Sequence, residues 1–159
     1  MTIKIICAGK VKEKYFRDAI DEYSKRLSRY TKLVIEEVAD EKTPENASEH
    51  EETLIREKEG ERMLKRIAPG DYCIAMTIPG RAYSSPQMAA HLDRLMGEGK
   101  SSIAFIIGGS LGLSDEVIRR ADEEMSFSKL TFPHQLMRVI LLEQIYRSFR
   151  IIHHEPYHK

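Results

Sequence analysis

The sequence predicts an α/β fold, in which helices cover both faces of a mostly parallel sheet. Segments rich in β-branched and apolar residues alternate with amphipathic segments along the chain. The strand-like segments are apolar almost throughout, as expected for strands that are buried on both faces. With 159 residues, of which 42% are hydrophobic and 31% charged, we expect one domain, residues 1–159, that buries its own core.

The first half of the chain predicts two strands and two helices. Ile3–Ala8 is β-branched and is followed by a glycine, which is typical of a buried strand. Glu13–Tyr30 repeats apolar residues at spacings of three and four, so we expect an amphipathic helix. Leu33–Val38 is the second expected strand. Ser48–Ile67 then predicts a highly charged helix with Ser48 as its N-cap.

The alternation continues through the middle of the chain. Asp71–Thr77 predicts the third strand, which is expected to run into a turn at Pro79 and the following glycine. Ser85 is expected to cap the next helix, with Pro86 in its favoured first position. Ser102–Ile107, the most apolar segment of the chain, predicts the fourth strand.

Two helices and a short strand are expected in the last third. Ser114 is a suitable N-cap for a short helix that ends at Ala121. Met125–Ser128 predicts a fifth strand. Pro133 opens a long helix that continues to about Ile151.

Ligands of open α/β sheets bind beyond the carboxyl ends of the strands. We therefore expect the site at three loops, Met76–Gly80, Gly108–Gly112 and Ser128–Pro133. The glycine-rich loop is neither GxGxxG nor a Walker loop, and no Lys-Ser/Thr pair follows it. It is either a tight turn or a loop that lets the backbone approach a flat ligand without phosphates. A phosphorylated-nucleotide-binding α/β protein stays an alternative.

The long C-terminal helix is apolar on more than one side. Between Leu136 and Ile152, eleven of the seventeen positions are apolar or tyrosine. A helix at a protein surface shows a single apolar stripe. We expect the second apolar side to form a homodimer interface. The alternative is a helix wholly buried in its own chain.

The tail after this helix is rich in histidine, with His153, His154 and His158 close together. No carboxylate or cysteine stands at metal-ligand spacing beside them, so we expect no metal site. One interpretation of the tail is a frayed, solvated terminus. The other is that one of its histidines accepts a proton near neutral pH.

The formal net charge is zero, which excludes a polycation that binds nucleic acid by bulk charge alone. Charge is nevertheless uneven, because basic residues predominate from Lys4 to Lys32 and acidic ones from Glu36 to Glu61. The acidic run is expected to be a solvated helix face. The basic segment leaves a local site for a polyanion open.

The longest apolar run has five residues, Ile103–Ile107, against the ~20 that a helix needs to cross a bilayer. We therefore expect no membrane span, and the N-terminal apolar run is too short for a signal peptide. Cys7 and Cys73 lie in strand-like segments and are expected to be buried thiols in a reducing compartment. The expected location is cytoplasmic.

A series of short motifs runs almost from end to end of the chain. They are Ile78-Pro79-Gly80, Ile106-Ile107-Gly108-Gly109 through Gly112-Leu113-Ser114, the loop Ser126–Phe132, Pro133-His134 with Leu136, Arg138, Val139, Glu143, Tyr146 and Arg147, and finally Pro156-Tyr157-His158. In order and spacing, this series resembles the large-subunit ribosomal RNA pseudouridine methyltransferases of the SPOUT (α/β-knotted) superfamily.

The resemblance implies S-adenosylmethionine as cofactor and methylation of N3 of a pseudouridine in a stem-loop of 23S rRNA, on the assembled ribosome. It also implies a homodimer and a C-terminal trefoil knot, which sequence patterns would not predict because threaded chains are rare. By the family pattern, the cofactor contacts Met76, Gly108, Phe127, Ser128, Lys129, Leu130, Thr131 and Phe132.

N3 of pseudouridine carries a proton, so the reaction needs a group that accepts it or favours the imide anion. His158 is the expected base, and Lys159 or Arg147 is expected to stabilise charge on the flanking carbonyls. Tyr157 is expected to stack on or orient the base. Contacts to RNA phosphates are expected from Lys10, Lys12, Lys14, Arg17, Arg26 and Arg29. A non-enzymatic dimeric ribosome-binding factor is the second alternative.

Overall fold

A five-stranded parallel sheet organises the chain. The computed structural model describes residues 1–159, and its strands run in the order β2-β1-β4-β3-β5 with every neighbouring pair parallel. This confirms the predicted fold class. The strands are β1 (Thr2–Ala8), β2 (Lys32–Val38), β3 (Tyr72–Ala82), β4 (Ser102–Ile107) and β5 (Glu123–Ser126).

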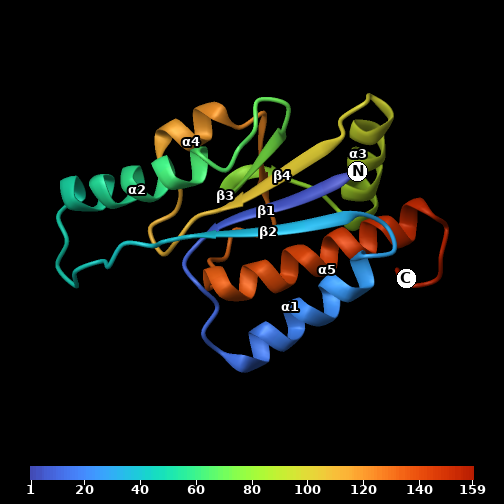
Figure 1. Ribbon diagram of the computed structural model, residues 1–159, viewed down its shortest axis with the longest axis horizontal. Coiled ribbons are helices and arrows are strands. Elements are labelled where there is room, and N and C mark those ends of the chain that lie inside the picture. The colour runs from blue at the N-terminus through green and yellow to red at the C-terminus, as the bar shows by residue number, and fades with distance from the viewer.

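Helices cover the two faces of the sheet as separate layers (Figure 1). One layer holds α1 (Lys14–Leu27), α3 (Ser85–Gly97) and α5 (His134–Ile152); the other holds α2 (Glu49–Leu64) and α4 (Asp115–Arg120). Each layer has its own buried core, because successive residues of a strand face opposite ways. In β1, Ile5 belongs to the core of the first layer and Ile6 to that of the second.

The helix starts follow local capping chemistry. The side chains of Ser48 and Ser114 accept backbone hydrogen bonds at the starts of α2 and α4, as predicted. The cap of α3 is Ser84, so the prediction of Ser85 is wrong. Ser84 forms a capping box with Gln87, whose side chain accepts from the Ser84 N–H at 2.9 Å. A capping box needs a Glu or Gln three residues after the cap, and only the Ser84 register supplies it.

The expected turn at Pro79 is wrong, because β3 continues past it to Ala82. Met76 and Arg81 both pair with Met125 of β5, so residues 77–80 bulge out of the strand. Gly80 packs directly on β5, where an added Cβ would lie 2.7 Å from the backbone. The bulge keeps one long strand and still places a loop at the carboxyl edge of the sheet.

The fifth strand begins two residues before the predicted Met125–Ser128, at Glu123. The sequence did not reveal this start, because two adjacent glutamates are unusual in a buried strand. Here each glutamate is hydrogen-bonded to a neighbouring element. Glu123 lies against His91 of α3, and Glu124 accepts from Thr77 of the β3 bulge.

One side of α5 is in the core and the other is partly exposed. Leu141, Leu142, Ile145 and Phe149 are buried in the first layer. Apolar residues on other sides of the helix are half-buried and belong to neither core cluster; they are Leu136, Val139, Ile140 and Ile151. The alternative of a helix wholly buried in its own chain is therefore wrong.

Both cysteines are free and buried, as predicted. Burial raises the pKa of Cys7 and of Cys73 to about 11, so both are thiols rather than thiolates at neutral pH. Among the helices, none is both long and apolar enough to span a membrane. The trefoil knot stays a prediction.

Candidate functional site

A cavity of about 790 Å³ opens at the carboxyl edge of the sheet. Its walls are the β3 bulge, the loop after β4 and the loop that joins β5 to α5. These are the three loops that the sequence predicted to converge. The volume lies within the range of roughly 300–1,000 Å³ that is usual for small-molecule sites.

Seven of the eight residues expected to bind the cofactor line this cavity: Met76, Gly108, Phe127, Ser128, Leu130, Thr131 and Phe132. Lys129 is exposed and lies outside the lining. Two serines shape the loop, since Ser126 Oγ accepts from the Ser128 N–H at 3.2 Å and Ser128 Oγ accepts from the Leu130 N–H at 2.9 Å. Leu130, 70% exposed, is an apolar side chain at the rim.

The glycine loop after β4 is a tight turn, as one interpretation of the sequence expected, and it also forms a wall of the cavity. Its approach to a flat ligand stays a prediction. Gly112 donates its N–H to the Gly109 carbonyl at 3.1 Å and has a φ of +84°. At Gly108, an added Cβ would lie 2.5 Å from the Gly112 carbonyl carbon. The backbone of Gly112 therefore leaves no room for a side chain at position 108, and a backbone cannot move aside as a flexible side chain can.

A buried carboxylate that sequence analysis missed, Glu59 of α2, lies against this loop. Its Oε2 accepts from the Glu41 N–H at 2.9 Å, and its Oε1 is buried without a partner. A Cβ on Gly109 would be 3.1 Å from Oε1. Burial raises the pKa of Glu59. Its position among acidic residues hid it, because the other glutamates of α2 are exposed or partly exposed. The acidic run as a whole is not one helix face, since its first part lies in β2 and the loop after it.

The cavity lining contains no lysine or arginine, and its titratable side chains are Glu124 and His134. Thr77 Oγ1 donates to Glu124 Oε1 at 3.1 Å. Burial and the charge of Arg138 lower the pKa of His134, so its imidazole is neutral at pH 7. The walls thus lack the cationic groups that usually hold phosphates.

Arg138 fixes the start of α5 beside the cavity. This side chain is 2% exposed and donates to Glu37 at 2.6 Å and to the carbonyls of Ala8 and Gly9 at 3.1 and 2.7 Å. It therefore ties α5 to the carboxyl ends of β1 and β2. A buried arginine needs such partners, because an unpaired buried charge is costly.

Three of the four expected catalytic residues cluster at the other end of α5, around a residue that was not predicted to act, Glu143. Arg147 donates to Glu143 at 2.6 Å, and the Tyr157 hydroxyl donates to it at 3.1 Å. Arg147 also lies 3.2 Å from His158 Nδ1 and 4.7 Å from the Tyr157 ring centre. The sequence does contain one indication of this contact, because Glu143 and Arg147 are four residues apart on a helix and such pairs face each other. Lys159, the fourth, is exposed.

The C-terminal tail folds back on the helix, so the interpretation of a frayed end is wrong. Glu155 accepts from Arg150 and from the Tyr30 hydroxyl, each at 2.7 Å. Arg150 also donates to the Pro156 carbonyl at 2.9 Å. Burial and Glu143 raise the pKa of Tyr157 to about 12, so it stays a phenol and does not act as a base near neutral pH.

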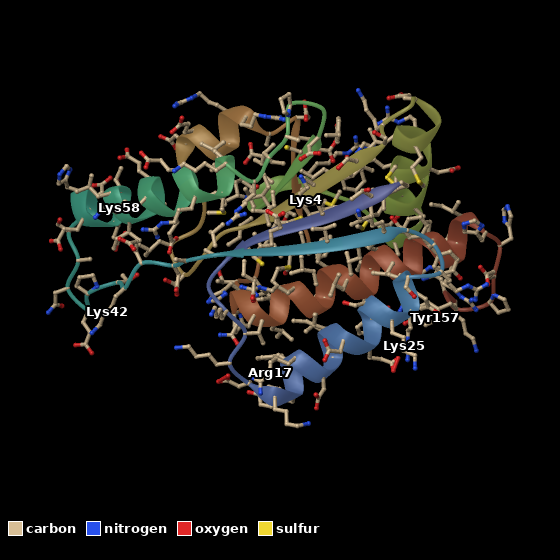
Figure 2. The ribbon with its side chains drawn as sticks, viewed as in Figure 1. Lys4, Arg17, Lys25, Lys42, Lys58 and Tyr157 are labelled. Carbon is tan, nitrogen blue, oxygen red and sulfur yellow. The ribbon has the colours of Figure 1, made fainter.

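The cavity and the tail lie at opposite ends of α5. His134 and Met137, in the first turn, line the cavity, whereas Arg147 and the tail lie at the far end. A helix of 19 residues is ~28 Å long. In Figure 2, Tyr157 of the tail lies far from Arg17 of α1, which bonds to the loop attached at the start of α5. One chain therefore does not bring the expected cofactor and catalytic residues together.

The exposed basic residues also divide between the two ends. The loop before α1 is attached near the cavity, where the Lys12 N–H donates to Gln135 at 3.4 Å. Exposed Lys10, Lys14 and Arg17 are close to Lys12 in the sequence. Arg29 lies near the tail, 3.4 Å from Glu155. No group of three or more His, Cys, Asp or Glu side chains is arranged to hold a metal ion.

Comparison with known proteins identifies the family. The family described as "Predicted SPOUT methyltransferase" matches residues 1–158. Proteins named ribosomal RNA large subunit methyltransferase H, from Bifidobacterium animalis subsp. lactis and Clostridium beijerinckii, are each 59% identical over 159 residues. The one from Lysinibacillus sphaericus is 56% identical. Each alignment covers 100% of both chains. The cavity lies where the three loops meet, and the family match extends along almost the whole chain. The chain therefore belongs to the SPOUT methyltransferase family.

Proposed function

We propose that residues 1–159 form a homodimeric cytoplasmic enzyme that transfers a methyl group from S-adenosylmethionine to N3 of a pseudouridine in a stem-loop of 23S rRNA, on the assembled ribosome. The observation that carries the proposal is the cavity without basic lining residues, in a methyltransferase family member. The names of full-length relatives, which specify the large-subunit rRNA, support the substrate class.

The residues of the cavity fit this cofactor. Met76, Leu130 and Phe132 offer apolar walls for a flat heterocycle, and the glycine loop exposes backbone groups for its polar edge. S-Adenosylmethionine has no phosphates, which agrees with a lining that contains no lysine or arginine. The same feature disfavours the alternative of a phosphorylated-nucleotide-binding protein.

The cofactor, when bound, supplies a methyl group on a positively charged sulfur. The contribution of the three loops is to hold it so that nucleophile, methyl carbon and sulfur come into line. Correct positioning of two reactants is worth several kcal/mol of a barrier, about 7–11 in favourable cases. The backbone restraints at Gly108 and the serine contacts at Ser126 and Ser128 make this wall rigid.

The tail of one chain is proposed to complete the cavity of its partner. Its own cavity lies a helix length away, and the half-buried apolar residues Leu136, Val139, Ile140 and Ile151 leave a face of α5 for a second copy to cover. Pairing through this face also brings basic residues from two chains toward one RNA. Such a dimer places Lys12 of one chain and Arg29 of the other at a shared site.

Proton removal from N3 is assigned to the cluster of Arg147 and His158. An Arg147 N–H donates to His158 Nδ1 in this arrangement, so the neutral imidazole carries its proton on Nε2. His158 therefore accepts a proton only when this contact opens. Arg147 then faces the substrate, where its charge stabilises the imide anion through a flanking carbonyl.

The experiment is to incubate ribosomes that lack the modification, and in parallel free 23S rRNA, with radiolabelled S-adenosylmethionine. The RNA is then digested and the labelled nucleoside identified. We expect label in N3-methylpseudouridine, with faster incorporation on ribosomes. Co-sedimentation with ribosomes without methyl incorporation would support the non-enzymatic binding factor and overturn the proposal.

A further inference from the structure

Glu124 places a carboxylate in the wall of the cavity. In β5, neighbouring residues face opposite ways. Glu123 lies on the α3 side, with its carboxylate oxygens 2.9 and 2.8 Å from His91 Nε2. Glu124 faces the other way and lines the cavity. The two adjacent glutamates thus have different environments, one in a polar network and one at the ligand site.

The carboxylate of Glu124 has little to neutralise it. Its hydrogen-bond partner is the Thr77 hydroxyl, which donates to Oε1, and Glu124 takes part in none of the ion pairs of the chain. The cavity lining adds no Lys, Arg or Asp, and its histidine, His134, is neutral at pH 7. The lining therefore carries one formal negative charge, held in place by Thr77.

We propose that Glu124 makes the cavity charge-selective, so that it binds the cationic methyl donor in preference to the neutral product. This inference rests on the function proposed above. The donor has a sulfonium, an ammonium and a carboxylate, with a net charge of about +1 at neutral pH. In the transfer, the S–CH₃ bond breaks with its electron pair left on sulfur, the methyl bonds to N3, and the N3 proton goes to the base.

The product is a neutral thioether, and a nearby anion no longer favours it. Glu124 thereby promotes the exchange of spent product for fresh donor. Two charges several ångströms apart in a partly solvated site attract by an amount that corresponds to about a three- to tenfold change in affinity. Salt in the solvent weakens this attraction.

The test is isothermal titration of the purified protein with S-adenosylmethionine and, separately, with S-adenosylhomocysteine. In Glu124→Gln the amide oxygen can still accept from Thr77, so the shape of the wall is kept while its charge is lost. We expect Glu124→Gln to weaken donor binding about three- to tenfold and to change product binding less than about twofold. Glu124→Asp retains the charge, and we expect it to retain the preference.

The matched control is Glu116→Gln, which removes an exposed carboxylate of α4 outside the cavity and should leave both affinities unchanged. Raising the salt concentration should reduce the donor-to-product preference of the unmodified protein, a measurement that needs no variant to fold. An equal loss for both ligands, or no loss, would overturn the role of Glu124. If the unmodified protein binds neither ligand, the proposed function itself fails.

Discussion

Arg150 donates to Glu155 at 2.7 Å and closes the C-terminal tail back on the end of α5. The Tyr30 hydroxyl, which donates to the other oxygen of Glu155, joins this contact to the end of α1. The position of Tyr157 and His158 is thus set by an anchor that precedes them by two and three residues.

Loss of this anchor should reduce catalysis without affecting cofactor binding. We expect Glu155→Ala to lower kcat/KM for methyl transfer roughly ten- to a hundredfold, because the tail loses its fixed position. Calorimetry should show an unchanged Kd for S-adenosylmethionine. Glu98→Ala removes an ion pair with Arg94 at the end of α3, which is more exposed than the Arg150–Glu155 pair, and should change neither value. Full activity of Glu155→Ala would contradict the anchoring role.

Removal of the expected base should slow the reaction while leaving the fold intact. His158 is exposed, so His158→Ala should melt within about 1 °C of the unmodified protein. We expect a loss of about 10²–10⁴-fold in methyl transfer, measured at saturating donor. His50→Ala, at an exposed position of α2, is the control. A loss below threefold would exclude His158 as the base.

The proposed dimer predicts complementation between two defective chains. Gly108→Ala damages the cavity and His158→Ala damages the tail, so each homodimer should be nearly inactive. A mixture of the two, allowed to exchange subunits, forms mixed dimers that hold one site with an intact cavity and an intact tail. We expect recovery of about a quarter of full activity, on random pairing. No recovery despite demonstrated exchange would show that the tail serves its own chain.

A methyl group at Gly108 should disrupt the cofactor wall. An added Cβ would meet the Gly112 carbonyl, so the loop must shift. We expect Gly108→Ala to weaken S-adenosylmethionine binding at least about tenfold by calorimetry. Gly97→Ala, at the end of α3 with no atom within 4 Å of the added Cβ, should bind normally. Equal affinities in the two variants would contradict the close packing of Gly108.

The buried carboxylate of Glu59 predicts a pH-dependent stability difference. Its pKa is raised in the folded chain, so its ionised form is disfavoured there. We expect Glu59→Gln to be more stable than the unmodified protein at pH 7, by about 1 kcal/mol from denaturant unfolding. The gain should shrink as the pH falls through and below the ordinary glutamate pKa, because Glu59 then becomes protonated in both states. A constant difference across this range would contradict the raised pKa.

Hydrophobic periodicity predicted the order of strands and helices and the convergence of three loops, because buried strands and caps leave strong local signals. Ser48 and Ser114 are examples. The failures have a common cause in tertiary contacts. Pro79 was expected to form a turn, but pairing of Arg81 with β5 keeps the chain in a strand. Glu123 and Glu124 were left outside the predicted fifth strand, because their contacts with His91 and Thr77 come from distant parts of the chain.

The grouping of the expected catalytic residues could be anticipated only in part. The resemblance supplied Arg147, Tyr157 and His158, and the structure places them around Glu143. No pattern in one chain reveals that this cluster is a helix length away from the cavity, because that follows from the direction of α5 across the sheet. Spacing along the sequence likewise gave no hint that Glu59 is buried.

The length of α5 has a consequence for how the protein behaves on dilution. If a working site needs the cavity of one chain and the tail of another, a single chain has no complete site and does not catalyse the reaction even slowly. Specific activity would then fall in step with the fraction of paired chains, and a plot of rate against protein concentration would curve upward at the dilute end. Cells would need to keep the protein above its self-association threshold for the modification to be made at all.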